Sequence, residues 1–318
     1  MYIAELPAKV KGDTSMYYIG IDGGGTSSRL VAIDRDINIL GHSLSGSTNI
    51  TSDTYENVCA NIKNLIGRFN TATNTKIEDC GVIFMGSAGA KVPGNAQKLE
   101  NIFREAGFIG KLRVVSDAEL VLAAETRGEP GIIVISGTGS ACFAMDKQGN
   151  MLRTGGWGHL IDDGGSGYRI GMDAIQAALM DFDGRGKNTL LTDMIRKNFK
   201  LQQIDHIQTY IYGDDFNKSR IAEIVMLVKE ASDKRDSTAR AIEANATKSL
   251  ICLARAMINK TGLSSHKLVI SGSVITLYEN IRENFCTSLE SEFPNVKITT
   301  VSEKPEMGAA YLALKENG

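Results

Sequence analysis

The sequence has no long hydrophobic run, almost no net charge and few cysteines, and each of these shortages excludes a class of protein. No apolar stretch approaches the roughly 18 residues that a membrane-spanning helix needs. Lysine and arginine together number 35 against 37 aspartate and glutamate among 318 residues, and the basic residues are dispersed along the chain. Neither nucleic acid nor an anionic membrane is therefore expected as a partner, and a small-molecule ligand is favoured.

Several motifs that mark cofactor and metal sites are also missing. The chain contains no GxxxxGK(S/T) and no GxGxxG, which excludes a P-loop and a dinucleotide fingerprint. It has no HExxH, and its four histidines are isolated from one another. The five cysteines are odd in number and far apart, which argues against a disulfide framework and a CxxC metal site. We interpret them as small core residues.

The composition is that of an ordinary globular protein. Hydrophobic residues make up 42% and charged residues 23% of the chain, which excludes disorder and a fibrous repeat. A chain of this length usually forms two domains. Residues 1–15 lack the apolar centre of a signal peptide, and the cysteines suit a reducing compartment. We expect a cytoplasmic protein with a flexible N-terminal extension over residues 1–15.

Short β-rich runs alternate with segments of helical periodicity. Runs at residues 17–21, 29–33 and 37–40 predict three strands, and apolar residues recur at helical spacing from residue 55 to 69. The same plan restarts with a strand at residues 131–136, which indicates a weak internal repeat. The alternation predicts an α/β fold with a partly parallel sheet in each half. The helices predicted in the second half include residues 220–231, 237–260 and 278–293.

A glycine-rich loop follows the first predicted strand. Asp22 precedes three glycines and then Thr26 and Ser27. Glycines let the backbone approach a ligand and turn its N–H groups toward an anion, while the hydroxyl groups add donors. The segment is typical of a phosphate cradle in which Asp22 positions a hydrated Mg²⁺. An ordinary hairpin turn capped by Asp22 is the structural alternative.

A second glycine loop, with the sequence Ile-Ser-Gly-Thr-Gly-Ser at residues 135–140, occupies the equivalent place in the second half. Two such loops that face each other across a cleft can grip a triphosphate from both sides. The pair therefore predicts a nucleotide site, whereas one loop alone is a weak signal.

Asp117 follows the strand predicted at residues 112–116 and begins a helix. It is either the N-cap of that helix or a catalytic carboxylate. Sequence statistics favour the cap, but carboxylates at the C-terminal edge of an α/β sheet face the crevice where ligands bind. As a base in that position, Asp117 could accept a proton from an attacking hydroxyl during phosphoryl transfer.

The single tryptophan, Trp157, lies in a cluster of glycines and carboxylates at residues 155–167. It could plug a gap between layers of the fold, or it could line a polar site in which glycine amides and a carboxylate bind sugar hydroxyls. Small residues at 271–273 and 308–310 lie beside two further predicted helices. They permit either close packing or the close approach of a flat purine.

Together these motifs resemble a known family, the N-acetylglucosamine kinases and BadF/BadG/BcrA/BcrD ATPases, which share the actin, Hsp70 and hexokinase fold. The similarity covers nearly the whole chain from Tyr17 onward. The pattern is especially similar to that of clostridial kinases that act on N-acetylmuramate and N-acetylglucosamine. The resemblance is carried, in chain order, by residues 21–26, 47–49, 117–118, 135–140, 155–159, Asp163 with 165–166, and 308–310.

The resemblance implies an α/β protein with the two-lobed actin-like (ribonuclease H-like) fold, in which duplicated βββαβαβα domains enclose ATP in a cleft. It implies an N-terminal lobe over residues 16–116 that a C-terminal helix at residues 306–318 completes. A C-terminal lobe with a helical insertion would span residues 117–305. A homodimer is the family expectation.

The resemblance also implies an ATP- and Mg²⁺-dependent kinase that phosphorylates the 6-hydroxyl of N-acetylglucosamine or N-acetylmuramate in cell-wall sugar salvage. Asp117 would be the general base, and Asp22 would position Mg²⁺ through water. The sugar would be held by Asn49, Thr138, Gly139, Gly156, Trp157 and Asp163. ATP would be held by Gly23, Gly24, Gly25, Thr26, Ser27, Gly137, Thr138, Gly139, Ser140, Gly272 and Gly308.

Two positions depart from the family pattern. Gly164 stands where relatives carry a Glu that can contact the sugar, and Ser271 replaces one glycine of a pair in the adenosine segment. The identity of the sugar stays open, and a glucosamine kinase is an alternative. A BadF/BcrA-type ATPase that activates a partner enzyme is another, but no cysteine lies in the motif that would ligate its iron–sulfur cluster. Residues 1–15 are too short for the helix-turn-helix of a sugar-sensing regulator.

Overall fold

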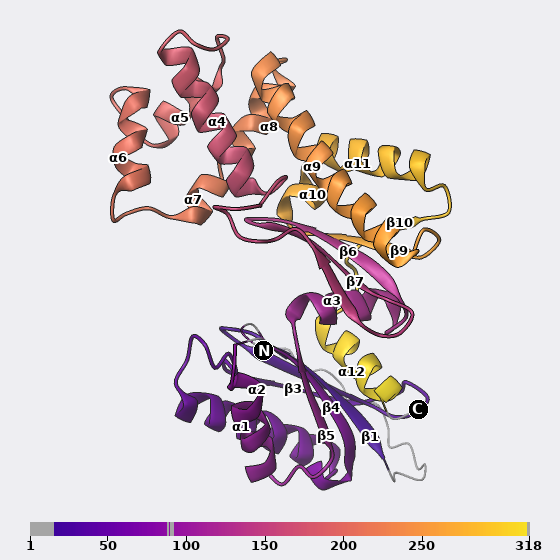
Figure 1. Ribbon diagram of the computed structural model, residues 1–318. Coiled ribbons are helices and arrows are strands. Elements are labelled where there is room, and N and C mark those ends of the chain that lie inside the picture. Colours follow the sequence, from indigo (N-terminus) through magenta and orange to yellow (C-terminus); the bar gives the residue numbers. More distant parts are fainter. Residues whose placement is uncertain (1–15, 88, 90–91, 317–318) are drawn as a thin grey trace. The chain divides into compact units, whose positions relative to one another are not determined.

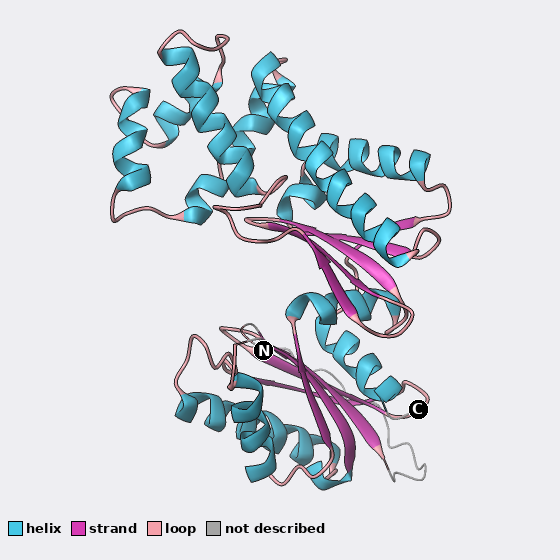
Figure 2. Cartoon of the chain, viewed as in Figure 1, coloured by secondary structure: helices cyan, strands magenta, loops and turns pink. Residues whose placement is uncertain are grey.

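A computed structural model describes residues 16–87, 89 and 92–316. The chain divides into two compact units, one formed by Met1–Gly128 with Glu303–Gly318 and the other by Glu129–Ser302. Each unit contains one five-stranded sheet with helices packed against it (Figures 1 and 2). The extension predicted at residues 1–15 lies outside the described residues.

The first unit has a mixed sheet with the order β3-β2-β1-β4-β5. Strands β1, β2 and β3 form an antiparallel meander, and β4 and β5 run parallel to β1. The strands are β1 (Tyr17–Gly23), β2 (Ser28–Ile33), β3 (Ile39–Ser45), β4 (Cys80–Ser87) and β5 (Lys111–Val115). The helices are α1 (Tyr55–Thr73), α2 (Asn95–Glu105), α3 (Asp117–Thr126) and α12 (Pro305–Glu316), with a short 3₁₀ helix at Ile77–Asp79.

The alternation of side chains along β1 explains how helices cover both faces of this sheet. Ile19 and Ile21 point to one face and pack in a buried cluster with Leu65 and Phe69 of α1. Gly20, between them, points to the other face, where α12 crosses the strand. Because both faces are covered, β1 does not alternate between apolar and polar residues from Tyr17 to Ile21.

The second unit repeats this plan with a sheet of the order β10-β9-β6-β7-β8. Here too a three-stranded antiparallel meander is followed by two parallel strands, so the internal repeat and the α/β fold class expected from the sequence are confirmed. The strands are β6 (Gly131–Ser136), β7 (Ser140–Met145), β8 (Met151–Thr154), β9 (Lys267–Ser271) and β10 (Lys297–Thr300).

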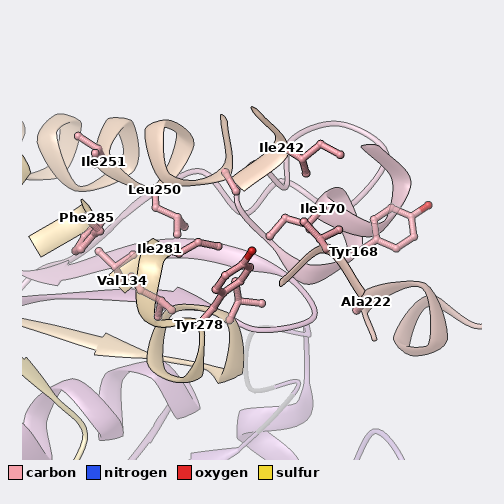
Figure 3. Packing of buried hydrophobic residues seen from close by; sticks show 14 of the residues in the cluster. Val134, Tyr168, Ile170, Ala222, Ile242, Leu250, Ile251, Tyr278, Ile281 and Phe285 are labelled. Atoms are coloured by element: carbon pink, nitrogen blue, oxygen red, sulfur yellow. The ribbon is translucent and has the colours of Figure 1, made fainter. Parts of the chain in front are cut away.

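Helices of the second unit form a large apolar core on one face of its sheet. Val134 of β6, Ile170 of α4, Leu250 of α9 and Phe285 of α11 belong to this core, as Figure 3 shows. The helices that continue the repeat are α4 (Gly167–Phe182), α9 (Ser237–Thr261), α10 (Ser273–Leu277) and α11 (Glu279–Glu292). The helical insertion between α4 and α9 comprises a 3₁₀ helix (Ile204–His206), α5 (Leu191–Asn198), α6 (Ile207–Tyr212), α7 (Lys218–Ala222) and α8 (Val225–Asp233).

Polar residues before the helices determine where they begin. Thr54, Ser116, Ser166 and Asp236 each accept a hydrogen bond from a backbone N–H in the first turn of α1, α3, α4 and α9. These bonds satisfy donors that have no partner inside the helix. Gly262, in the left-handed conformation, ends α9.

The prediction of one continuous helix over residues 220–231 is wrong, because the structure contains two helices, α7 and α8, with a tight turn between them. The turn is made of i to i+3 hydrogen bonds, including Met226 N to Glu223 O and Leu227 N to Ile224 O. Such a turn keeps residues three apart on one face, as an α-helix does, so the apolar pattern cannot reveal it. The helix predicted at residues 278–293 is confirmed as α11 (Glu279–Glu292), and a separate short helix, α10, precedes it.

The boundary between the units also differs from the prediction, because it falls after Gly128 rather than after residue 116. Helix α3 belongs to the first unit since α12 packs on it: Gly308 approaches the backbone of Leu120 and Ala124 so closely that no side chain fits. The N–H of Glu303 also donates to the Glu125 carboxylate at 2.7 Å.

The expectation of small core cysteines holds for Cys80 and Cys142 but is wrong for the exposed Cys252. Among the residues that the structure describes, no helix combines the length and apolar character that crossing a bilayer requires.

We expect Gly20→Ala to destabilise the protein by about 1–3 kcal/mol or more, because the added methyl group would overlap the Glu306 carbonyl oxygen and the Ala310 nitrogen. Gly67→Ala is the matched control. Nothing lies within 4 Å of the methyl group that it adds to the exposed face of α1, so it should stabilise the helix by about 0.5–1 kcal/mol. Urea unfolding of both variants tests the close approach, and equal midpoints would contradict it.

Candidate active site

The first glycine loop forms a tight, partly exposed turn between β1 and β2. Gly24 N donates to Ser27 O at 3.2 Å, and Thr48 N donates to Gly24 O at 3.3 Å, so the loop is tied to the segment that follows β3. Gly25 and Thr26 are exposed at its tip. Their amide and hydroxyl groups lie where a phosphate could approach.

Asp22 lies at the end of β1 in a locally negative environment. Burial raises the pKa of its carboxyl, and the nearby carboxylates Glu306 and Asp117 raise it further, while Arg29 opposes the shift. The Arg29 Nη1 atom is 3.8 Å from Asp22 Oδ2. A bound cation would relieve this repulsion, so the surroundings of Asp22 fit a divalent metal ion. No three acidic, histidine or cysteine side chains among the described residues form a metal cluster, so such an ion would be held mainly by water and phosphate oxygens.

Asp117 is the first residue of α3 and is exposed. Ser116 is the N-cap: its Oγ accepts from Glu119 N at 3.4 Å, whereas Asp117 Oδ1 accepts only from the adjacent Ala118 N, at 2.9 Å. The interpretation of Asp117 as the cap is therefore wrong. Its carboxylate and that of Asp22 both lie at the carboxyl ends of parallel strands, at the edge of the sheet where α/β proteins bind ligands.

Asn49 lies in a buried segment beside the first glycine loop. Its side-chain Oδ1 accepts from Thr51 N at 2.9 Å. This bond turns the amide nitrogen Nδ2 toward Gly25, where a methyl group on the glycine would be 3.9 Å away. The structure thus brings Asn49, which the resemblance implies as a sugar-binding residue, together with the first glycine loop.

The second glycine loop joins β6 to β7 and is tied to the start of α4. Gly137 N donates to Gly139 O at 2.9 Å, and Gly167 N donates to Gly137 O at 2.8 Å. The Ser136 hydroxyl donates to Gly165 O at 2.7 Å. Gly272 packs so closely on Ser136 that a side chain there would overlap its carbonyl group. The loop is therefore held from both sides by hydrogen bonds and packing within the second unit.

A cavity of about 370 Å³ opens on this loop. Asp163 in its wall is buried, and its Oδ1 accepts from Ser140 N at 2.7 Å. The cavity is lined by Ile135, Gly137, Thr138, Gly139, Ser140, Ala141, Gly156, Gly158, Asp163 and Lys218. It thus unites every residue of the second unit that the sequence predicts as sugar-binding, except Trp157.

Trp157 itself is 59% exposed and does not line the cavity, although its neighbours Gly156 and Gly158 do. The Arg153 guanidinium carbon lies 3.9 Å from the centroid of the indole ring. This cation–π contact holds the ring beside the cavity rather than within it.

Gly164, the departure from the family pattern, lies against α9. A methyl group there would be 3.0 Å from Ser249 Cβ, and the Gly164 carbonyl accepts from the Ser140 hydroxyl at 2.8 Å. A side chain at this position would crowd the Ser249 side chain of α9, which would have to shift by a few tenths of an ångström. The packing therefore gives a local reason for glycine.

A second cavity of about 280 Å³ shares Gly137 and Thr138 with the first. Its walls are mostly apolar and come from α7, α8 and α10, and Tyr278 and Ala222 of this wall are labelled in Figure 3. The other lining residues are Gly167, Ser219, Glu223, Val225, Met226, Lys229, Ser273, Val274 and Leu277. An apolar slot that adjoins an anion-binding loop suits a nucleotide, with the base in the slot and the phosphates at the loop.

The sequence missed the contribution of the helical insertion to both cavities. Lys218, Glu223 and Met226 lie in or between the short helices α7 and α8, outside any motif. Gly272 and Gly308 are both predicted to bind ATP. Gly272 adjoins the wall of the second cavity through its neighbour Ser273, whereas Gly308 belongs to the first unit, where it packs on α3.

Known proteins share this architecture. A crystal structure of a candidate N-acetylglucosamine kinase from Chromobacterium violaceum matches with a TM-score of 0.66 at 23% identity, over 95% of this chain and 99% of that one. The hexokinase of the ROK family from Thermus thermophilus matches with a TM-score of 0.57 at 14% identity, over 94% and 98% of the two chains. The fold is therefore that of the actin-like sugar kinases.

Sequence similarity gives a narrower class. Residues 19–313 match the BadF/BadG/BcrA/BcrD ATPase family, and the chain belongs to that family. It is 36% identical to the N-acetylmuramic acid/N-acetylglucosamine kinase of Clostridium acetobutylicum, over 94% of this chain and 99% of the relative. It is 28% identical to the N-acetyl-D-glucosamine kinase of Dictyostelium discoideum, over 93% and 97% of the two chains.

We expect Asp22→Asn to raise the melting temperature at neutral pH in the absence of divalent cations. The folded-state pKa of Asp22 is raised, so the ionised carboxylate opposes folding once the pH exceeds its unfolded pKa of about 4, and the gain should vanish below that pH. Thermal unfolding at pH 4 and pH 7.5 measures the difference.

Asp34→Asn is the control, and we expect it to change the melting temperature in the opposite direction. Slight burial raises the pKa of Asp34, but hydrogen bonds from Asn38 and from the Asp36 amide outweigh it and lower the pKa below its ordinary value. This variant should lose stability at neutral pH. A melting temperature that falls equally in both variants would contradict the repulsion at Asp22.

Proposed function

We propose that this protein is an ATP-dependent kinase that phosphorylates the 6-hydroxyl of N-acetylglucosamine, N-acetylmuramate or both. One observation carries the proposal: the rigid glycine loop after β6 is shared by an apolar slot and by a polar cavity with a buried carboxylate. A nucleotide and a polyol would meet at such a loop. The names of the two relatives that match over nearly their whole length support the choice of amino sugars.

In this proposal the two glycine loops hold the phosphates of ATP. Residues from Gly24 to Ser27, of which Gly25 and Thr26 are exposed, supply donors in the first unit, and residues from Gly137 to Ser140 supply them in the second. Adenine occupies the slot beside Gly272. Mg²⁺ would be held near Asp22 through water and would neutralise charge on the phosphates.

The sugar is held by hydrogen bonds to Asn49 in the first unit and to Thr138, Gly139, Gly156 and Asp163 in the second. Asp163 is suited to accept from a sugar hydroxyl, since its Oδ2 atom is buried and has no hydrogen-bond donor. The Lys218 ammonium, 3.3 Å from Oδ2, offsets part of the cost of burying this acceptor, and a bound hydroxyl would supply the hydrogen bond that it lacks. Trp157 lies at the margin of the cavity, where it can contact a bound sugar.

Asp117 acts as the general base. The oxygen of the sugar 6-hydroxyl forms a bond to the γ-phosphorus as the bond from that phosphorus to the ADP oxygen breaks, and Asp117 accepts the hydroxyl proton. Exposure of Asp117 leaves its carboxylate accessible to a substrate. The products are a sugar 6-phosphate and ADP, as expected for an enzyme of cell-wall sugar salvage. The homodimer and the cytoplasmic location stay predictions of the sequence.

The first test is ADP release with Mg-ATP and a panel of N-acetylglucosamine, N-acetylmuramate, glucosamine, glucose and no sugar. We expect release that depends on one or both N-acetylated sugars, because these are the substrates in the names of the relatives. Release with glucosamine alone would replace the proposal by a glucosamine kinase. Release that needs no sugar would favour an ATPase that activates a partner.

Asp117→Asn should lower kcat by about 10²- to 10⁴-fold, the usual share of a general base, with little change in the binding of either substrate. Asp36→Asn, which changes another exposed carboxylate of the first unit, should leave kcat unchanged. Steady-state kinetics and calorimetric binding of ATP separate the two effects. Turnover of Asp117→Asn near that of the parent protein would remove this residue from the base role.

A further inference from the structure

The polar cavity contains one positive and one negative side chain, Lys218 and Asp163, among its lining residues. Their closest atoms, Lys218 Nζ and Asp163 Oδ2, are 3.3 Å apart. The remaining lining residues are small or apolar, or carry only a hydroxyl. The charge of a ligand in this cavity would therefore be sensed mainly by this pair.

The two oxygens of Asp163 have different environments. Oδ1 accepts from Ser140 N at 2.7 Å, which fixes the orientation of the carboxylate. Oδ2 contacts the Lys218 ammonium without hydrogen-bond geometry and is a buried acceptor without a donor. A substrate hydroxyl would complete its coordination, and that hydroxyl would then lie beside the ammonium group.

The ammonium group of Lys218 is held in place by its surroundings. Lys218 begins α7, which packs against α4 so closely that a side chain at Gly171 would overlap the Ile221 carbonyl. Its Nζ lies 5.4 Å from the centroid of the buried Tyr168 ring. The side chain is 33% exposed, so it stands at the margin of the cavity, where a substituent that extends from the sugar would pass.

An ammonium group has three N–H donors, so Lys218 can contact Asp163 and a substrate oxygen together. N-acetylmuramate differs from N-acetylglucosamine by a lactyl ether at O3, which ends in a carboxylate. If the neighbouring 4-hydroxyl donated to Asp163 Oδ2, the carboxylate on O3 would be within reach of the ammonium group, which is 3.3 Å from that oxygen. Without a cation, a second carboxylate beside Asp163 would be repelled and poorly solvated.

We propose that Lys218 binds the lactyl carboxylate of N-acetylmuramate and so determines whether this enzyme accepts the acidic sugar. The inference rests on the proposed function and goes beyond it, because it assigns the choice between two sugars to one residue. The role is one of specificity, and Lys218 takes no part in phosphoryl transfer.

The test compares the two sugars within each variant. Lys218→Gln should lower the ratio of kcat/KM for N-acetylmuramate to kcat/KM for N-acetylglucosamine by about 10- to 100-fold, the usual size of a hydrogen bond between charged groups. Lys218→Glu should lower the ratio further through repulsion. A loss of activity that is equal for both sugars cancels in the ratio, so the ratio reports on the carboxylate that only N-acetylmuramate carries.

Lys197→Gln, which removes an exposed lysine of the helical insertion outside both cavities, is the matched control and should keep the ratio of the parent protein. The KM for ATP is measured for all three variants. An unchanged ratio in Lys218→Gln would overturn the inference, and so would a rise in the KM for ATP that accounts for the whole loss of activity, because Lys218 would then contact phosphate.

The same measurements separate this inference from the proposed function. If the parent protein phosphorylates N-acetylglucosamine but not N-acetylmuramate, the amino-sugar kinase stands and the role of Lys218 fails. If it phosphorylates neither, the proposed function fails. Calorimetric binding of N-acetylmuramate without ATP gives an independent readout, in which Lys218→Gln should weaken binding by a similar factor.

Discussion

The attachment of the second glycine loop to the start of α4 is the constraint on which the rest of the candidate site depends. Hydrogen bonds from Gly167 N to Gly137 O and from Ser136 Oγ to Gly165 O hold the loop against the helix. The bond from Ser140 N to Asp163 Oδ1 then places a carboxylate beside the same loop. The two cavities meet at this loop, since both are lined by Gly137 and Thr138, and a loop held by such bonds lowers the entropic cost of binding.

In the first unit, close packing of a helix on the sheet brings two carboxylates near each other. Helix α12 can lie on β1 only because Gly20 has no side chain, and this approach brings Glu306 near Asp22. The resulting repulsion costs stability in the absence of a cation. Strained or destabilised groups of this kind are characteristic of functional sites, where they are retained because a ligand relieves them.

Much of the fold and part of the site follow from local sequence signals. The strands of both meanders and the glycine loops that end β1 and β6 depend on interactions over a few neighbouring residues. Their effects are therefore visible in the sequence. The break between α7 and α8 is not, because Ile221 and Ile224 keep the same apolar spacing in a turn as in a helix. Asp117 had two interpretations until the structure showed Ser116 as the cap.

The sequence by itself determined the α/β class, the repeated plan and the positions of the two glycine loops, since periodicity and glycine placement are properties of short segments. Only the tertiary structure decided which distant residues share a cavity. Lys218 meets Asp163 because α7 packs on α4, and Trp157 stays outside the cavity because Arg153 lies over its ring. Such contacts join residues far apart in the chain, and their free energy depends on packing that no local pattern encodes.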